Sequence, residues 1–276
     1  MKRRNGWMAL AALMMALALA GCGAEAPETQ AKAADDTALV DEAVAQALLD
    51  GQESGLWYDG ECAAEGHAVL DVQEEDGQTV VYLVGSSCSF GFCSGNFVSV
   101  SGMGATPLRL TFDRAADGTL TLAERWDPED GTRYADSIRE TFPEALQADA
   151  LDAQSRWPDL WSQEKAYAAA YLEELDRPDA PIGSWGDFTF PLATDEGMSV
   201  AASNELLGRT ELSGYPYYLG TEERLEDGVR WVYATAWETD GDGRGTATYT
   251  KYRYDDGEVV QQLVYLVDGD TVTPQQ

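Results

Sequence analysis

The fold class follows from residues 67–84, which read HAVLDVQEEDGQTVVYLV. Apolar and polar side chains alternate at the start of this stretch, and the run 80–84 is apolar on both faces. Alternation with a period of two is typical of a half-buried strand, and a continuous apolar run is typical of a central strand. The Asp76-Gly77 pair between the two runs favours a tight turn with positive φ at both positions. These residues predict an antiparallel hairpin.

The same pattern recurs through the rest of the chain. Alternating runs at 108–113 and 119–126 flank another Asp-Gly pair, and three later runs read as strands: 229–237, 248–254 and 259–267. Further Asp-Gly pairs lie at 227–228, 240–241, 242–243, 256–257 and 268–269. We therefore expect an α+β protein whose sheet is mainly antiparallel and built from hairpins.

Helices are expected in two regions. Asp36 or Thr37 is a candidate N-cap for a helix that ends near residues 50–51, and its apolar face consists of Val40, Val44, Ala47 and Leu48. The second region, 135–176, predicts one or two helices. The later of these opens at Trp157-Pro158 and presents Leu160, Tyr167, Ala168, Tyr171, Leu172 and Leu175.

The N-terminus has the organisation of a secretion signal. Three basic residues at positions 2–4 precede an uncharged run at 7–20, which is shorter than the roughly 20 residues that a transmembrane helix needs. The run ends in Leu-Ala-Gly-Cys22, which resembles the lipobox of bacterial lipoproteins. The resemblance implies cleavage before Cys22 and lipidation of its sulfur. Acyl chains would then anchor the protein to the membrane, because each buried CH₂ contributes about 0.8 kcal/mol.

Four segments follow from this organisation. Residues 1–21 are predicted to be the signal peptide, and 22–36 the lipidated cysteine with a flexible tether that lacks bulky apolar residues. An α+β domain is expected at 37–178. The Pro-rich stretch 176–181 would separate it from a β-rich domain at 182–276.

The acidic composition excludes some partners. All 49 acidic residues follow Cys22 whereas three of the 18 basic residues precede it, so the mature formal charge is about −34. A field of this sign repels nucleic acid and anionic lipid headgroups, and it favours cations or basic partners. No nucleic-acid partner is therefore expected.

Three cysteines remain after Cys22: Cys62, Cys88 and Cys93. Outside the cytoplasm thiols tend to pair, so we expect one disulfide and one free thiol. If the hairpin closes at Asp76-Gly77, residues whose numbers sum to about 153 face each other. A bridge from Cys62 to either of the others is then feasible and is favoured over a local Cys88–Cys93 loop.

Motifs that would carry catalysis are incomplete. Residues 91–95 (GFCSG) resemble a nucleophile elbow around Cys93, but a predicted strand follows and the only histidine, His67, precedes it. A Ser-x-x-Lys match at 162–165 lacks the accompanying Lys-Thr-Gly. Residues 240–245 (DGDGRG) miss the spacing of an EF-hand loop. We therefore predict no enzyme, no cofactor and no metal site, although a surface cation near 240–245 and a hydrolase using a carboxylate pair remain alternatives.

Aromatic side chains concentrate in the last third of the chain. Such side chains form stacking platforms for ligands, and they also fill the cores of half-buried strands. The candidate ligand-binding residues are Trp231, Tyr233, Trp237, Tyr252 and Tyr254.

Residues 56–176 resemble a domain that follows the membrane part of clostridial peptidases of the β-lactam-sensing antirepressor kind. The shared residues include Glu65-Gly66-His67, Val81-Tyr82, Ser101-Gly102, Pro107, Phe112, Asp117-Gly118, Trp126-Asp127-Pro128-Glu129-Asp130-Gly131, Ser137-Ile138 and Phe142-Pro143. The peptidase motif His-Glu-x-x-His is absent. The resemblance implies a sensing or interaction module on the extracytoplasmic face of the cell membrane, with an envelope sensor protein or a small ligand as its partner.

Overall fold

The computed structural model of the protein describes residues 27–51, 60–240 and 244–275. The predicted signal peptide and Cys22 lie outside the described residues. The helices are α1 (Pro27–Asp50), α2 (Tyr134–Thr141), α3 (Gln147–Leu151), α4 (Trp157–Glu174) and α5 (Val200–Leu207). None of these helices combines the length and apolarity that a membrane span requires.

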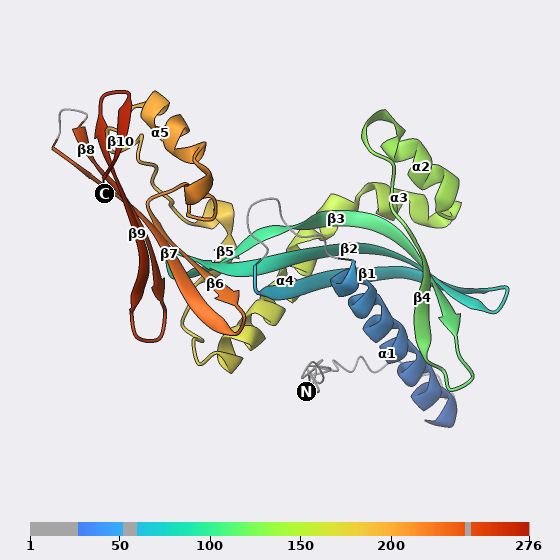
Figure 1. Cartoon of the computed structure of the whole chain (residues 1–276). Coiled ribbons are helices and arrows are strands. Elements are labelled where there is room, and N and C mark those ends of the chain that lie inside the picture. Colours follow the sequence, from blue (N-terminus) through green and yellow to red (C-terminus); the bar gives the residue numbers. More distant parts are fainter. Residues whose placement is uncertain (1–26, 52–59, 241–243, 276) are drawn as a thin grey trace.

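One sheet runs through the molecule, and the predicted α+β class is confirmed (Figure 1). Its strands are β1 (Cys62–Glu75), β2 (Gln78–Cys93), β3 (Asn96–Arg114), β4 (Leu120–Trp126), β5 (Ile182–Ser184), β6 (Gly220–Glu226), β7 (Val229–Thr239), β8 (Arg244–Arg253), β9 (Val259–Asp268) and β10 (Thr271–Gln275). The order is β10-β9-β8-β7-β6-β2-β3-β4, with β1 paired to β2 and β5 paired to β3. Only the β3–β5 pairing is parallel among these pairs.

The β1–β2 hairpin confirms the predicted turn. Asp76 and Gly77 have φ values of 50° and 86°, the positive angles that the tight turn needs. From Glu75 back to Asp71, the residue numbers of each β1–β2 pair sum to 153. A bulge next to Asp71 then shifts the register between the two strands by one residue. Cys62 consequently lies opposite Phe90 rather than Gly91.

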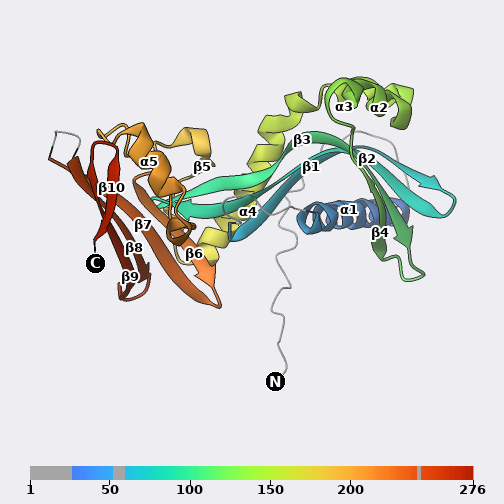
Figure 2. The ribbon, with the colours of Figure 1, turned by 45° about the horizontal axis from the view of Figure 1, so that its top comes forward.

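Strand β2 forms the centre of the first half of the molecule and is buried along nearly all of its length. Val81 and Leu83 point into a cluster with α1, whereas Val80 and Tyr82 point into a cluster with α2 and α3. Figure 2 shows α1 on one side of the long strands and these helices on the other. A strand covered on both faces has no solvated side, which explains why the run 80–84 is apolar throughout.

Helix α1 begins earlier than the sequence suggested. Its predicted apolar face is confirmed, because Val40, Val44, Ala47 and Leu48 are all buried. The predicted cap at Asp36 or Thr37 is wrong, since the helix starts at Pro27, and the part of the predicted tether from Pro27 onward is helical. Residues 27–36 contain no bulky apolar side chain, but they are rich in Ala, Glu, Gln and Lys, which favour helix, and proline is well suited to the first helical position.

Helix α4 crosses β1 at close range. A Cβ placed on Gly66 would lie 2.5 Å from the carbonyl oxygen of Leu160. One residue on, the Gln163 side chain accepts from the His67 N–H (3.2 Å) and donates to the His67 carbonyl (3.1 Å). Gln163 therefore satisfies backbone groups that an edge strand would otherwise leave open to another chain.

The last third of the chain continues the same sheet. Strand β6 meets β2 where Glu222 pairs with Cys93, and four hairpin connections lead on to β10. Positive φ values at Asp227, Gly228, Gly257 and Gly269 confirm turns at three of the predicted Asp-Gly sites. Helix α5 packs on one face of this part, over a core that includes Ala247, Tyr265, Val267 and Val272.

Candidate functional site

The five predicted ligand-binding residues lie on two faces of the β7–β8 ladder. Trp231, Tyr233 and Trp237 alternate along one face of β7. Tyr252 pairs with Val232, so it lies on the opposite face, and the Tyr254 N–H donates to the Arg230 carbonyl on that same side. The five side chains therefore do not form one platform.

Trp231 and Tyr233 belong to a group with charged neighbours, which we call the aromatic–cation cluster: Trp231, Tyr233, Lys251, Arg224 and Glu226. The Lys251 ammonium lies 4.8 Å from the Trp231 ring centre and 4.7 Å from the Tyr233 ring centre. The Arg224 guanidinium lies 4.8 Å from the Tyr233 ring centre. These separations fall within the range in which a cation is attracted to an aromatic face.

Glu226 ties the aromatic–cation cluster together. Lys251 donates to it at 2.8 Å, and the Tyr233 hydroxyl donates to its other oxygen. Burial alone would raise the pKa of Glu226, but the bonds from Lys251 and Tyr233 outweigh burial and lower it. Burial likewise acts to lower the pKa of Lys251, and Glu226 raises it instead. Both groups are held in their charged forms, so the cluster keeps cation and carboxylate side by side.

The sequence predicted only some of the residues of the aromatic–cation cluster. Alternation along β7 identified the two aromatic residues, but the three charged residues come from β6 and β8. Their positions follow from the registers, in which Trp231 pairs with Arg224 and Tyr233 pairs with Lys251. Alternation along β8 places Lys251 on a defined face of that strand, but its position opposite Tyr233 on β7 follows only from the register.

The other candidate aromatic residues have structural neighbours. The Trp237 indole donates to the Glu196 carbonyl (3.0 Å) and packs against the α5 core. Tyr254 is 47% exposed, and the Arg177 guanidinium lies 5.1 Å from its ring centre. Trp237 thus supports the packing of α5, and Tyr254 lies at the outer side of the junction described next.

Two arginines join the halves of the molecule. Arg177 makes a two-pronged bond to Glu223 (2.6 and 3.0 Å), and Arg230 bonds Glu61 (2.8 Å) and Glu223 (3.2 Å). The Arg177 guanidinium lies 3.5 Å from the Phe92 ring centre. A two-pronged bond between arginine and carboxylate fixes the relative orientation of the two side chains as well as pairing their charges. The junction therefore aligns β6 and β7 with the start of β1.

The predicted disulfide is wrong: Cys62, Cys88 and Cys93 are free and buried. Cys88 and Cys93 point to opposite faces of β2, where they join different clusters. Cys62 and Cys88 share a face but are diagonal neighbours, because Cys62 pairs with Phe90 and Cys88 with Ala64. Diagonal Cα atoms lie about 7–8 Å apart, which exceeds the usual span of a disulfide.

The thiols are also unsuited to nucleophilic attack. Burial raises the pKa of Cys62 and that of Cys93 to about 12, and it raises the pKa of Cys88 as well. A nucleophilic cysteine needs thiolate character, which comes from a lowered pKa. The strand after Cys93 also matches the sequence expectation, since β3 begins at Asn96 where an elbow would need a helix.

A polar network lies beneath α1 and α4 and was not anticipated. The His67 Nδ1 atom is 2.9 Å from Glu65, its Nε2 atom is 3.7 Å from Asp41, and the Tyr167 hydroxyl donates to Glu65 (2.8 Å). Glu164 is buried next to this network, and its carboxyl group interacts with the Ser86 hydroxyl and the Cys88 thiol without a hydrogen bond of good geometry. Glu65 and Glu164 are both buried, so they do not offer a carboxylate pair to an entering substrate.

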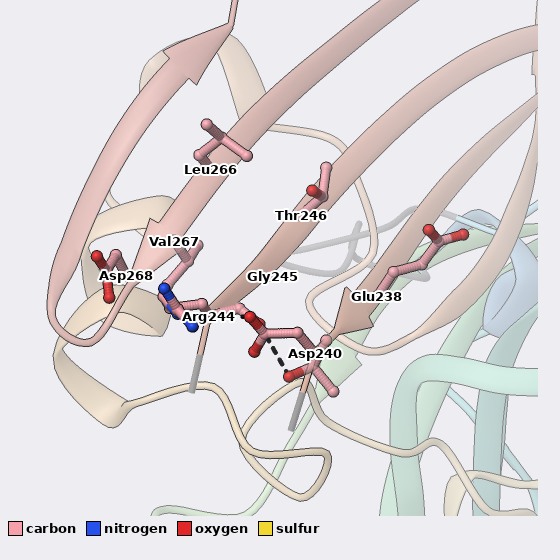
Figure 3. A pocket seen from close by; sticks show the side chains of 9 residues that line it. Glu238, Asp240, Arg244, Gly245, Thr246, Leu266, Val267 and Asp268 are labelled. Atoms are coloured by element: carbon pink, nitrogen blue, oxygen red, sulfur yellow. Dashed lines mark hydrogen bonds and ion pairs between the residues drawn. The ribbon is translucent and has the colours of Figure 1, made fainter. Parts of the chain in front are cut away.

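A broad depression of about 510 Å³ lies at the end of the β7–β8–β9 ladder (Figure 3). Its charged lining consists of Glu238, Asp240, Arg244 and Asp268, and the Arg244 Nε atom lies 3.4 Å from Asp240. Arg244 thus neutralises part of the acidic lining. Within the described ranges, no group of three His, Cys, Asp or Glu residues is arranged to hold a metal ion.

Comparison with protein families, with curated proteins and with solved structures finds no match to this chain. The candidate site therefore has to be interpreted from its own geometry.

Proposed function

We propose that the protein is a lipid-anchored, extracytoplasmic binding module without catalytic activity, and that it contacts a ligand or partner through the aromatic–cation cluster. The observation that carries the proposal is the composition of that cluster. Trp231 and Tyr233 are joined there by two cations in a chain with a strong surplus of acids. Tryptophan, tyrosine and arginine are the residues enriched where proteins bind their partners.

The position of the aromatic–cation cluster fits this role. Trp231 lies near the β6–β7 turn, whereas α5 packs over the other end of these strands (Figure 1). Trp231 is half-buried and Tyr233 is buried, so Trp231 supplies the aromatic face that a partner can reach, next to the polar groups of Arg224, Lys251 and Glu226. A site that joins apolar faces to a few polar groups can orient a ligand as well as hold it.

The anchoring part of the proposal rests on Cys22. Helix α1 begins five residues after this cysteine, and five residues span at most about 18 Å even when fully extended. A lipid on the cysteine would therefore hold the N-terminal end of α1 close to the bilayer. The resemblance of residues 56–176 to the domain of β-lactam-sensing antirepressor peptidases supports a role in cell-envelope sensing.

The proposal is tested by crosslinking the lipidated protein in its own membranes and identifying what is recovered with it. Trp231→Ala should reduce recovery of the bound partner at least about fivefold, since truncation of a central aromatic residue typically costs more than about 1 kcal/mol of binding. Trp157→Ala is the matched control, because Trp157 is also partly exposed but lies on α4. Cys22→Ser should release the protein from the membrane fraction.

Two results would contradict the proposal. If wild type, Trp231→Ala and Trp157→Ala recover equal amounts of the partner, the aromatic–cation cluster does not take part in partner binding. If Cys22→Ser associates with the membrane as wild type does, a lipid on Cys22 is not the anchor. Thermal unfolding of each variant separates loss of binding from loss of fold.

A further inference from the structure

His67 lies between two carboxylates that come from different elements. Its Nδ1 atom is 2.9 Å from Glu65 on β1, and its Nε2 atom is 3.7 Å from Asp41 on α1. The imidazole side chain is 8% exposed and the Glu65 side chain 4%. A neutral imidazole donates from one nitrogen only, whereas the imidazolium donates from both. With a carboxylate facing each nitrogen, this arrangement suits the protonated form.

We propose that His67 is a protonation-dependent clamp that holds α1 to β1, closed while the imidazolium is present and weakened when its proton leaves. On deprotonation one ring nitrogen presents a lone pair to a carboxylate, and the attraction on that side becomes repulsion. Asp41 is the partner that would be lost first, because it is the more distant and the more exposed, with a 34% exposed side chain.

The surroundings of His67 support this direction. Burial acts to lower the pKa of His67, but the hydrogen bond and charge of Glu65, followed by those of Asp41, outweigh burial and raise it. From α4, Gln163 holds the His67 backbone and Tyr167 bonds the other oxygen of Glu65. The residue opposite on β2 is Gly85, which carries no titratable group.

Glu164, the remaining titratable side chain near Glu65, also makes the packed state less stable as pH rises. Glu164 on α4 is buried near Glu65, and burial is the main reason that its pKa is raised. Glu164 therefore resists ionisation while α4 stays packed, and a rise in pH disfavours the packed state. Since the pKa of His67 is also raised, the stability that the clamp contributes is present at low pH and is lost as pH rises through the titration of His67.

The clamp has a defined element on which to act. The buried face of α1 begins at Val40, next to Asp41, and the helix extends from Pro27. Release of Asp41 would therefore weaken the attachment of α1 at the start of its packed portion and leave Val44, Ala47 and Leu48 in the core. The expected motion is local loosening rather than unfolding, because each fully buried valine or leucine contributes about 1.5–3 kcal/mol.

The test uses the mature chain, whose single histidine gives one set of imidazole NMR signals. The titration midpoint of His67 should lie above the ordinary value of about 6.5 and should fall in Asp41→Asn. Asp36→Asn is the matched control, because Asp36 is also on α1 but faces Arg114 (3.6 Å) and should leave the midpoint unchanged. Amide exchange at residues 38–45, corrected for its intrinsic pH dependence, should be about tenfold faster above the midpoint for each unit by which the midpoint is raised.

The clamp is refuted if the midpoint lies at or below the ordinary value, or if Asp41→Asn and Asp36→Asn move it equally. Exchange in α1 that is equally protected on both sides of the midpoint also overturns it. His67→Gln gives a second readout, since it should abolish the pH dependence of α1 exchange in a protein that still folds. None of these measurements depends on the lipid or on the aromatic–cation cluster.

Discussion

Replacement of the buried carboxyl group of Glu164 by an apolar side chain is expected to stabilise the protein. Glu164 has no solvent exposure, and its oxygens make no hydrogen bond of good geometry. The Ser86 hydroxyl and the Cys88 thiol act to lower the pKa of its carboxyl group, but burial outweighs them and raises it. Its helix α4 packs on β1 and β2, where Ala168 and Leu172 belong to the core on the same face. Glu164→Met keeps a similar length and flexibility and removes the group that must be desolvated.

The magnitude follows from the burial of that carboxyl group. A buried polar group without a partner costs about 1–3 kcal/mol, and the variant should recover part of this, because Ser86 and Cys88 already offset some of the cost in the wild type. For a protein of this size, each kcal/mol corresponds to a rise in the unfolding temperature of about 2–4 °C. The gain should depend on pH. Because burial raises the pKa of Glu164, its neutral form is favoured in the folded state, and the wild type loses stability as pH rises through the folded value.

The assay is thermal unfolding at pH 4, 6 and 8 for the wild type, Glu164→Met and Glu173→Met. Glu173 lies on the same helix but is exposed, so its replacement should change the unfolding temperature little and equally at each pH. The difference between Glu164→Met and wild type should be largest at pH 8. A variant that is less stable than wild type at every pH would show that the carboxyl group has partners that offset its burial, and the reasoning would fail.

Three further outcomes are expected. All three cysteines after Cys22 should resist alkylation at pH 8 in the folded protein and react fully in urea, as mass spectrometry can count, because burial keeps them as thiols. Gly66→Ala should lower the unfolding temperature, since the added methyl group meets the Leu160 backbone 2.5 Å away and α4 must shift. Arg230→Met should cost about 3–5 kcal/mol in urea unfolding because Glu61 and Glu223 lose a shared buried partner, and adding Glu61→Met should restore part of that loss.

Turns and the faces of elements were the part of the fold that the sequence could predict. Asp76-Gly77 specifies its hairpin because the geometry of the turn depends on those two residues alone. Val40, Val44, Ala47 and Leu48 predict the buried face of α1 because helical spacing places them together. Such signals are local, and no knowledge of distant strands is needed to interpret them.

The predictions that were wrong depended on the register between strands, or concerned a helical segment without an apolar pattern. The bulge next to Asp71 moved Cys62 by one residue along β2 and helped to place it diagonally from Cys88. The start of α1 was missed because residues 27–36 lack the apolar periodicity on which the prediction relied. The contact between His67 and Asp41 was also hidden, because Asp41 comes from a separate helix.

The distribution of charge bears on the recognition surface that we propose for this acidic protein. Most arginines of the described chain lie within 4 Å of a carboxylate, and the surplus acids remain on the solvated surface. Glu226 in the aromatic–cation cluster and Glu222 next to the cluster balance Lys251 and Arg224, so the local charge is close to neutral. Fields from exposed charges fall off over about 8 Å at physiological salt. The proposed recognition at this surface would therefore depend on short-range stacking and hydrogen bonds, whereas the surplus acids would set only how readily a charged partner or an anionic bilayer comes near.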